Sequence, residues 1–154
     1  MLNYRKKILV AVDGSAVSDK AVYEAVWMAG CSKGAFPNKV YAVFSKVVHS
    51  DDYLDMFPIS PSPTAGEDDR RWEEIIEMVF LVARKLAREN GVELETRVVS
   101  GPPAESIIKL AREIDADVIV IGSTGKGRVV RSLLGSVSAE VMNKAPCSVY
   151  LVRA

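Results

Sequence analysis

The chain has 154 residues, of which 49% are hydrophobic and 26% are charged. This length and composition predict one globular domain that spans residues 1–154. Its 20 basic and 20 acidic residues cancel, so the net charge gives no reason to expect a nucleic acid or a membrane as a partner. No apolar run approaches the roughly 20 residues of a membrane span, and residues 1–7 lack a signal region, so we expect a cytoplasmic protein.

Strand and helix patterns alternate along the chain. In chain order they predict a strand over 7–12, a helix over 18–29 with Ser15 or Ser18 as N-cap, a strand over 40–48, a helix over 68–90, a strand over 92–99, a helix over 104–114, a strand over 116–122, a helix over 136–144 and a strand over 148–152. Prolines among Ser, Asp and Gly predict a flexible, exposed loop over residues 49–67. The alternation predicts an α/β fold, a single doubly wound parallel sheet of five strands with helices on both faces.

The two cysteines, Cys31 and Cys147, are far apart in the sequence and stand in apolar surroundings. We therefore expect two buried thiols without a redox role.

Glycines follow the fourth predicted strand. Gly122 and Gly125 come directly after the apolar run 117–121, and Gly135 begins the last predicted helix. Glycine lets a backbone approach a ligand closely, and a helix N-terminus with free N–H groups suits an anion. The pattern predicts a phosphate cradle, and hence a nucleotide site. A side chain at Gly122 or Gly125 should then abolish binding and leave the fold intact.

Hydroxyl and basic side chains accompany these glycines. The hydroxyls of Ser136 and Ser138 are candidate ligands for phosphate oxygens. Lys126, Arg128 and Arg131 lie between the two glycine clusters, where they could reach a polyphosphate or point into water. Their sequence positions leave both alternatives open.

An acidic turn follows the first predicted strand. Asp13, Gly14 and Ser15 stand where a carboxylate could accept hydrogen bonds from ribose hydroxyls or hold a hydrated magnesium ion. An Asp-Gly pair after a strand is also a common turn, and Asp caps helices well. The sequence leaves open whether Asp13 serves the ribose or the metal.

These motifs together resemble a known family. Gly122-x2-Gly125-x9-Gly135-Ser136 resembles the nucleotide-binding signature of the ATP-binding branch of the universal stress protein family. Residues 6–15 resemble the family's first strand and acidic turn, and residues 146–152 resemble its closing strand.

The resemblance carries further implications. It implies the Rossmann-like strand order 3-2-1-4-5, which brings Asp13 and Gly122 to one switch point, where ligands of such sheets bind. It also implies that Val137 contributes its backbone N–H, that Ser45 lies near the adenine, and that two copies form a dimer through the last strand, Ser148–Val152.

Other site classes fit the sequence poorly. A P-loop and a G-x-G-x-x-G fingerprint fail on spacing, and a response regulator would need an acidic partner beside Asp13. The sole histidine, His49, lies in the predicted loop, so we expect neither a Ser-His-Asp triad nor a histidine metal site.

The sequence therefore favours a binding module over an enzyme. The module would hold ATP or AMP, with Mg²⁺ on the phosphates, and its occupancy would change a surface that other proteins read. The alternative is a slow ATP hydrolase or phosphotransferase in which Asp13 orients metal or water. A third interpretation, an interaction protein with a vestigial site, is disfavoured by the intact set of glycines and serines.

Overall fold

The computed structural model describes residues 5–31, 37–46, 67–124 and 134–154. Its elements are β1 (Lys7–Ala11), α1 (Ala16–Gly30), β2 (Lys39–Lys46), α3 (Glu67–Asn90), β3 (Glu93–Ser100), α4 (Pro103–Glu113), β4 (Val118–Gly122), α5 (Ser136–Lys144) and β5 (Ser148–Val152). Each predicted helix and strand is confirmed within the described residues; the last two residues of the predicted strand 40–48 lie outside them. The predicted loop over 49–67 lies outside the described residues except for Glu67, which begins α3.

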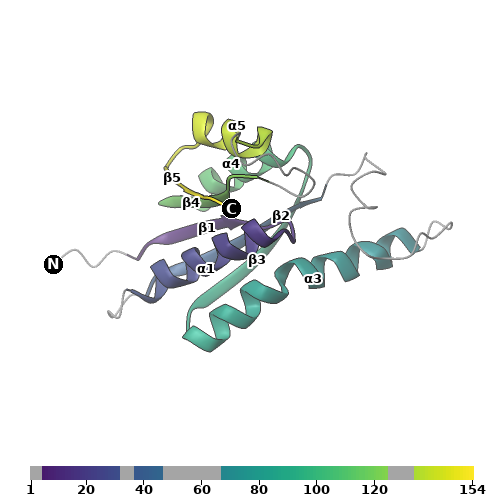
Figure 1. The fold of residues 1–154 in the computed structure, drawn as a ribbon, viewed down its shortest axis with the longest axis horizontal. Coiled ribbons are helices and arrows are strands. Elements are labelled where there is room, and N and C mark those ends of the chain that lie inside the picture. Colours follow the sequence, from purple (N-terminus) through teal and green to yellow (C-terminus); the bar gives the residue numbers. More distant parts are fainter. Residues whose placement is uncertain (1–4, 32–36, 47–66, 125–133) are drawn as a thin grey trace.

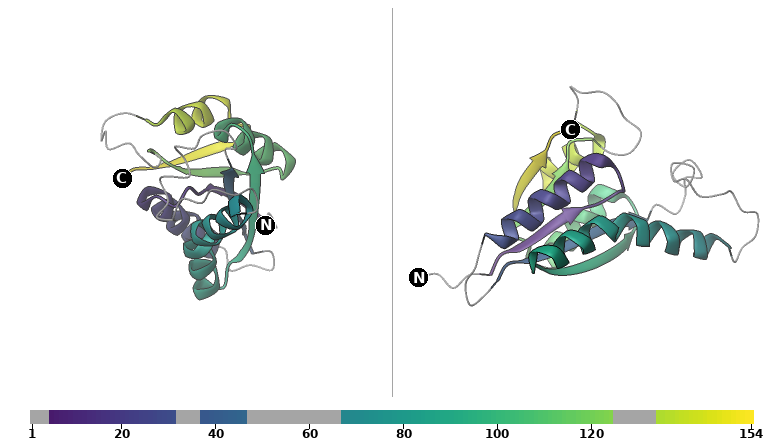
Figure 2. Two further views of the ribbon diagram at one scale, coloured as in Figure 1. Left: turned by 90° about the vertical axis from the view of Figure 1, so that its right-hand side faces the viewer. Right: turned by 60° about the horizontal axis from the view of Figure 1, so that its bottom comes forward.

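The five strands form one parallel sheet in the order β3-β2-β1-β4-β5. This confirms the predicted fold class and the strand order implied by the resemblance. Helices α1 and α3 cover one face of the sheet and α4 and α5 cover the other (Figures 1 and 2). The chain reverses its direction of winding between β1 and β4, and β3 and β5 form the two edges.

Two hydrophobic clusters separate the helices from the sheet. Along β1, Ile8 and Val10 belong to the cluster under α1 and α3, whereas Leu9 belongs to the cluster under α4 and α5. Both faces of β1 are therefore buried, which is why the central strands are continuous apolar runs and do not alternate with polar residues. On α3, one apolar face contributes to the first cluster, through Trp72, Ile75, Val79, Phe80 and Ala83.

A side-chain hydrogen bond sets the beginning of β4. The sequence predicts a strand from Ala116, but the carboxylate of Asp117 accepts a hydrogen bond from the backbone N–H of Lys7 at 2.7 Å. Asp117 thereby ties the start of β4 to the start of β1, and the strand begins at Val118.

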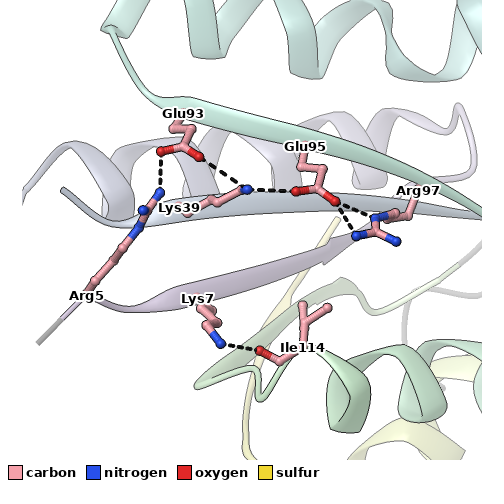
Figure 3. A network of polar contacts seen from close by, with 7 residues as sticks. All are labelled: Arg5, Lys7, Lys39, Glu93, Glu95, Arg97 and Ile114. Carbon is pink, nitrogen blue, oxygen red and sulfur yellow. Dashed lines mark hydrogen bonds and ion pairs between the residues drawn. The ribbon is translucent and has the colours of Figure 1, made fainter. Parts of the chain in front are cut away.

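A ladder of charged side chains lies on the sheet near the β3 edge (Figure 3). The ammonium group of Lys39 lies 2.7 Å from a carboxylate oxygen of Glu95 and 3.2 Å from one of Glu93. Arg5 pairs with Glu93, and Arg97 pairs with Glu95. We call these five residues the charged ladder.

The cysteines depart from the prediction. Cys31 is exposed, because it caps the C-terminal end of α1 and does not lie on that helix's buried face. Cys147 is half-buried, and its burial, with a smaller contribution from Asp117, raises the pKa of its thiol. Among the helices that the structure describes, none is both long and apolar enough to cross a membrane.

Candidate functional site

A cavity of about 230 Å³ opens at the carboxyl ends of β1, β2 and β4. The first turns of α4 and α5 form its other walls. Its lining combines apolar side chains, small hydroxyl side chains and one carboxylate, from Ala11, Val12, Asp13, Ser18, Val43, Ser45, Pro103, Ile107, Ile121, Gly122, Thr124, Gly135, Ser136, Val137 and Ser138. The cavity lies at the switch point of the sheet, where a doubly wound fold binds its ligands.

The turn after β1 places Asp13 in the cavity wall. Gly14 has φ +79°, a conformation that suits glycine, and the backbone N–H of Ser15 donates to Asp13 Oδ1 at 2.9 Å. The hydroxyl of Ser15 accepts a hydrogen bond from the N–H of Ser18 at 3.2 Å, which confirms Ser15 as the N-cap of α1. Gly14 and Ser15 are not among the described residues that line the cavity, so their observed role is to shape the turn that presents Asp13.

Negative charge gathers at this turn. Asp19 lies in the first turn of α1, and partial burial followed by repulsion from Asp13 raises the pKa of its carboxyl. Two carboxylates therefore meet where the chain leaves β1. A cation or a hydroxyl donor near Asp13 would relieve this repulsion.

Gly122 lies in the cavity wall, but its lack of a side chain has a reason inside the protein. A Cβ at this position would lie 2.6 Å from Cγ1 of Val17 and 3.3 Å from its Cβ. The sequence predicts that a side chain here would abolish binding and leave the fold intact, but its Cβ would meet Val17 of α1, so we expect it to disturb the packing as well. Gly122 allows the first turn of α1 to pack against the end of β4.

The first turn of α5 faces the cavity. Its N-cap, Gly135, has φ −62° and ψ 154°, and its N–H donates to the carbonyl of Ser123 at 2.8 Å. Gly135 has no side chain to cap the turn. The N–H groups of Ser136, Val137 and Ser138 have no carbonyl partner within the helix, so this turn offers hydrogen-bond donors at its positive end.

The part of the cavity wall formed by β2 and α4 is mostly apolar. Ser45 is buried, and its hydroxyl donates to the carbonyl of Gly101 at 3.0 Å. Val43 of β2 and Pro103 and Ile107 of α4 line the cavity with it. This wall is suited to the flat, apolar faces of an aromatic ring system.

The structure brings most of the predicted site residues together. Asp13, Ser45, Gly122, Gly135, Ser136, Val137 and Ser138 all line the one cavity. Gly125, Lys126, Arg128 and Arg131 lie outside the described residues.

Sequence reasoning missed the apolar lining and two hydroxyl residues. Val12 and Ile121 stand close to the carboxyl ends of β1 and β4, which meet at the switch point, and that position was the available signal for them. Val43 lies within β2, so the sequence held no such signal for it. Ser18 was predicted only as a possible N-cap and Thr124 not at all, although both lie within a few residues of a predicted motif.

The described residues hold no group of three or more His, Cys, Asp and Glu side chains placed to bind a metal ion. A magnesium ion that arrives on phosphates needs only one or two carboxylates from the protein. Asp13 fits that lesser requirement, since it is the one carboxylate among the described lining residues.

Comparisons with known proteins agree with this geometry. A universal stress protein of Methanocaldococcus jannaschii is 34% identical over 158 aligned positions, which cover 98% of this chain and 84% of the relative. The crystal structure of a universal stress protein in complex with cAMP is similar at TM-score 0.69 and 27% identity, covering 96% of each chain. A universal stress protein from Archaeoglobus fulgidus in complex with dAMP is similar at TM-score 0.63 and 26% identity, covering 97% of this chain and 98% of the other.

The sequence model of the universal stress protein family matches residues 5–153. The strand order, the position of the cavity and the extent of these matches agree, and the chain belongs to the universal stress protein family.

Proposed function

We propose that this protein binds an adenine nucleotide, ATP or AMP, in the cavity at the switch point and acts as a nucleotide-dependent binding module in the cytoplasm. The observation that carries the proposal is the pairing of two features in one cavity. Asp13 stands at the end of β1, and the first turn of α5 presents backbone N–H groups that its N-cap, Gly135, has no side chain to cap.

The ligand's parts have complementary partners in this cavity. The apolar wall of Val43, Pro103 and Ile107 would hold the base near Ser45, and Asp13 would accept hydrogen bonds from the ribose hydroxyls or hold Mg²⁺. The N–H groups at the start of α5 would bind a phosphate. A role for Gly125, Lys126 and Arg128 remains part of the proposal.

The cavity's size limits what it encloses. Its volume of about 230 Å³ lies below the range of about 300–1,000 Å³ that is usual for pockets that bury a whole drug-sized ligand. The described residues would therefore enclose the nucleoside part, and a polyphosphate would extend beyond them.

Two similar proteins support the choice of ligand. Relatives at 27% and 26% identity were crystallised with cAMP and with dAMP, which are both adenine nucleotides. Both matches extend over nearly the whole of this chain.

We favour a binding module over an enzyme because of the side chains that line the cavity. Asp13 is the one ionisable side chain among the described residues that line it. A hydrolase needs a group that orients or deprotonates water while other groups stabilise the charge on the phosphate. Asp13 alone supplies at most one of these roles, so we expect any turnover of ATP to be far slower than the roughly 10 s⁻¹ of a typical enzyme.

We also propose that two copies pair through β5. Tyr150 on this edge strand is 42% exposed and Met142 on the overlying α5 is 46% exposed, while Val149 and Leu151 are half-buried. The opposite edge, β3, exposes Val98 but carries the charges of Glu93, Glu95 and Arg97, which discourage pairing. Because only the β5 edge of the sheet is apolar, pairing through it would give a closed, two-fold dimer.

Isothermal titration calorimetry with purified protein tests the proposed ligand. We expect ATP with Mg²⁺, or AMP, to bind with a Kd in the micromolar range, about −8 kcal/mol. GTP titrated under the same conditions is the control, and we expect it to bind more weakly. Absence of heat with both adenine nucleotides, from protein first stripped of any bound nucleotide, would reject the proposal.

A further inference from the structure

Ser138 is the most deeply buried hydroxyl in the cavity wall. It lies in the first turn of α5 and is only 2% exposed. Its Oγ lies 3.1 Å from the carbonyl oxygen of Ser123 and 3.0 Å from that of Gly135, and donates to both. A serine hydroxyl has a single hydrogen, so these two carbonyls share it. That hydrogen is therefore not available for a phosphate oxygen.

The carbonyl that Ser138 contacts belongs to a junction between three elements. Ser123 directly follows β4, and its N–H donates to the carbonyl of Val152, the last residue of β5, at 2.7 Å. Its own carbonyl accepts from the N–H of Gly135 at 2.8 Å as well as from Ser138. Two donors from the first turn of α5 thus converge on one oxygen at the end of the central sheet.

We propose that Ser138 is a positioning residue for the phosphate end of the site and does not contact the phosphate through its hydroxyl proton. This inference rests on the proposed function. Ser138 fixes the first turn of α5 against the end of β4, and the N–H groups of Ser136, Val137 and Ser138 then point at the place where a phosphate binds. Charge-assisted hydrogen bonds depend strongly on distance and angle. A turn that is held at a single point should therefore bind an anion less well than one that Ser138 also holds.

The neighbouring serine has a different position. Ser136 stands two residues earlier in the same turn, lines the same cavity and is exposed. Its hydroxyl is therefore placed to contact a ligand, whereas the hydroxyl of Ser138 is directed into the protein.

Removal of the Ser138 hydroxyl should leave the fold intact. The Ser123 carbonyl keeps the N–H of Gly135 as a donor, and the Gly135 carbonyl keeps the N–H of Ala139 at 2.9 Å. No buried carbonyl would lose its last partner, so the Ser138→Ala variant avoids the large penalty of an unsatisfied group.

The test compares AMP with adenosine by calorimetry, because the two ligands differ in the phosphate alone. In Ser138→Ala we expect the affinity for AMP to fall about tenfold, while the affinity for adenosine stays within about twofold. Ser106→Ala is the matched control. Its hydroxyl also donates from α4 to a backbone carbonyl, that of Ser100 at 3.3 Å, but it is not among the described residues lining the cavity.

The ratio of the two affinities separates the outcomes. A Ser138→Ala protein with the wild-type ratio of AMP to adenosine affinity would overturn the positioning role, and so would an equal loss of both ligands. Wild-type protein that binds neither ligand would instead overturn the proposed function itself. A ratio that falls in Ser138→Ala and not in Ser106→Ala is the expected result.

Discussion

Gly122 shows how one missing side chain connects packing to the site. The nearest atoms to its hypothetical Cβ belong to Val17, at 2.6 Å and 3.3 Å. Valine is stiff about χ1, and its Cβ can move away only if the backbone of α1 moves with it. A methyl group at Gly122 would therefore push the first turn of α1 from β4, and with it the turn that carries Asp13.

We expect Gly122→Ala to lower the free energy of unfolding by about 1–3 kcal/mol, the usual cost of overpacking. In a Val17→Ala background the same substitution should cost less, since Cγ1, the atom at 2.6 Å, is gone and only Cβ at 3.3 Å remains. Urea unfolding of the wild type, both single variants and the double variant gives the coupling energy, expected to exceed about 0.5 kcal/mol. Equal costs in the two backgrounds would show that Val17 is not the reason for the glycine.

The sequence revealed most of the polar residues and the glycines of the site, but not the reason for each. Gly122 was predicted from its position after an apolar run, and the structure places it in the cavity wall. Its contact with Val17 depends on how closely α1 crosses β4, which no sequence pattern records. The two carbonyls that accept from Ser138 likewise become neighbours only when β4 and α5 are assembled.

At the scale of elements, the charged ladder at the β3 edge makes the stability of the fold depend on pH. Hydrogen bonds to Lys39 lower the pKa values of Glu93 and Glu95, and the hydrogen bond to Glu95 raises the pKa of Lys39. Carboxyls with lowered pKa values stabilise the fold above their unfolded pKa of 4.5, and this contribution is lost as the pH falls through their folded values. The pKa of Lys39 is shifted in the opposite direction. The stability that Lys39 contributes is therefore present at low and neutral pH and is lost only in strong alkali.

Lys39→Met should therefore destabilise the protein at pH 7, and should matter less at an acid pH below the folded pKa values of Glu93 and Glu95. These pairs are partly exposed, so we expect a loss of about 1 kcal/mol at pH 7. Urea unfolding at both pH values measures the difference. Lys85→Met, an exposed lysine of α3 on the other face of the sheet, is the control. The same loss at the acid pH as at pH 7 would show that packing of the Lys39 side chain over Tyr41, and not its charge, is responsible.

Secondary structure was the most predictable level of this molecule. Buried central strands need apolar side chains on both faces, and α3 needs one apolar stripe, so β1, β4 and α3 could be recognised from the sequence. Cys31 was predicted wrongly because its exposure depends on which side of the last turn of α1 faces water. The apolar lining by Val43 and Ile107 was missed because it depends on strand register and on the placement of α4.

At the scale of the whole molecule, the strand order gives the site its location. Segments around residues 13, 45, 122 and 136 are far apart in the sequence and meet because β1 and β4 are neighbours. The alternation of elements predicted a doubly wound sheet, whereas its order came from the family resemblance. Local patterns do not specify which strands pair, since pairing is decided by the packing of the complete chain.

The unequal edges of the sheet lead to a prediction about assembly. We expect light scattering to give about 34 kDa, twice the chain mass of 16.8 kDa. Tyr150→Lys should shift the protein toward monomer, because a lysine on an edge strand opposes pairing. Tyr23→Lys alters a tyrosine that is 58% exposed on α1, and it should leave the dimer unchanged. A wild-type monomer at tens of micromolar would contradict pairing through β5.

The most direct test of the nucleotide site substitutes the N-cap of α5. A Cβ at Gly135 would lie 3.5 Å from the carbonyl oxygen of Ser123 and 3.6 Å from Oγ of Ser138, both ordinary contacts. Its φ of −62° and ψ of 154° suit any residue, so the fold should tolerate a side chain there. An Asp in this position caps the free N–H groups of the helix and brings a negative charge to the place of the phosphate.

Calorimetric titration of AMP into Gly135→Ala, Gly135→Asn and Gly135→Asp measures this competition. We expect affinity to fall least for Ala, further for Asn and at least about 100-fold for Asp, since two or more charge-assisted hydrogen bonds are lost. The free energy of unfolding of Gly135→Asp should equal or exceed that of the wild type. If a folded Gly135→Asp protein binds AMP as tightly as Gly135→Ala does, the phosphate does not bind at α5 and the account is contradicted.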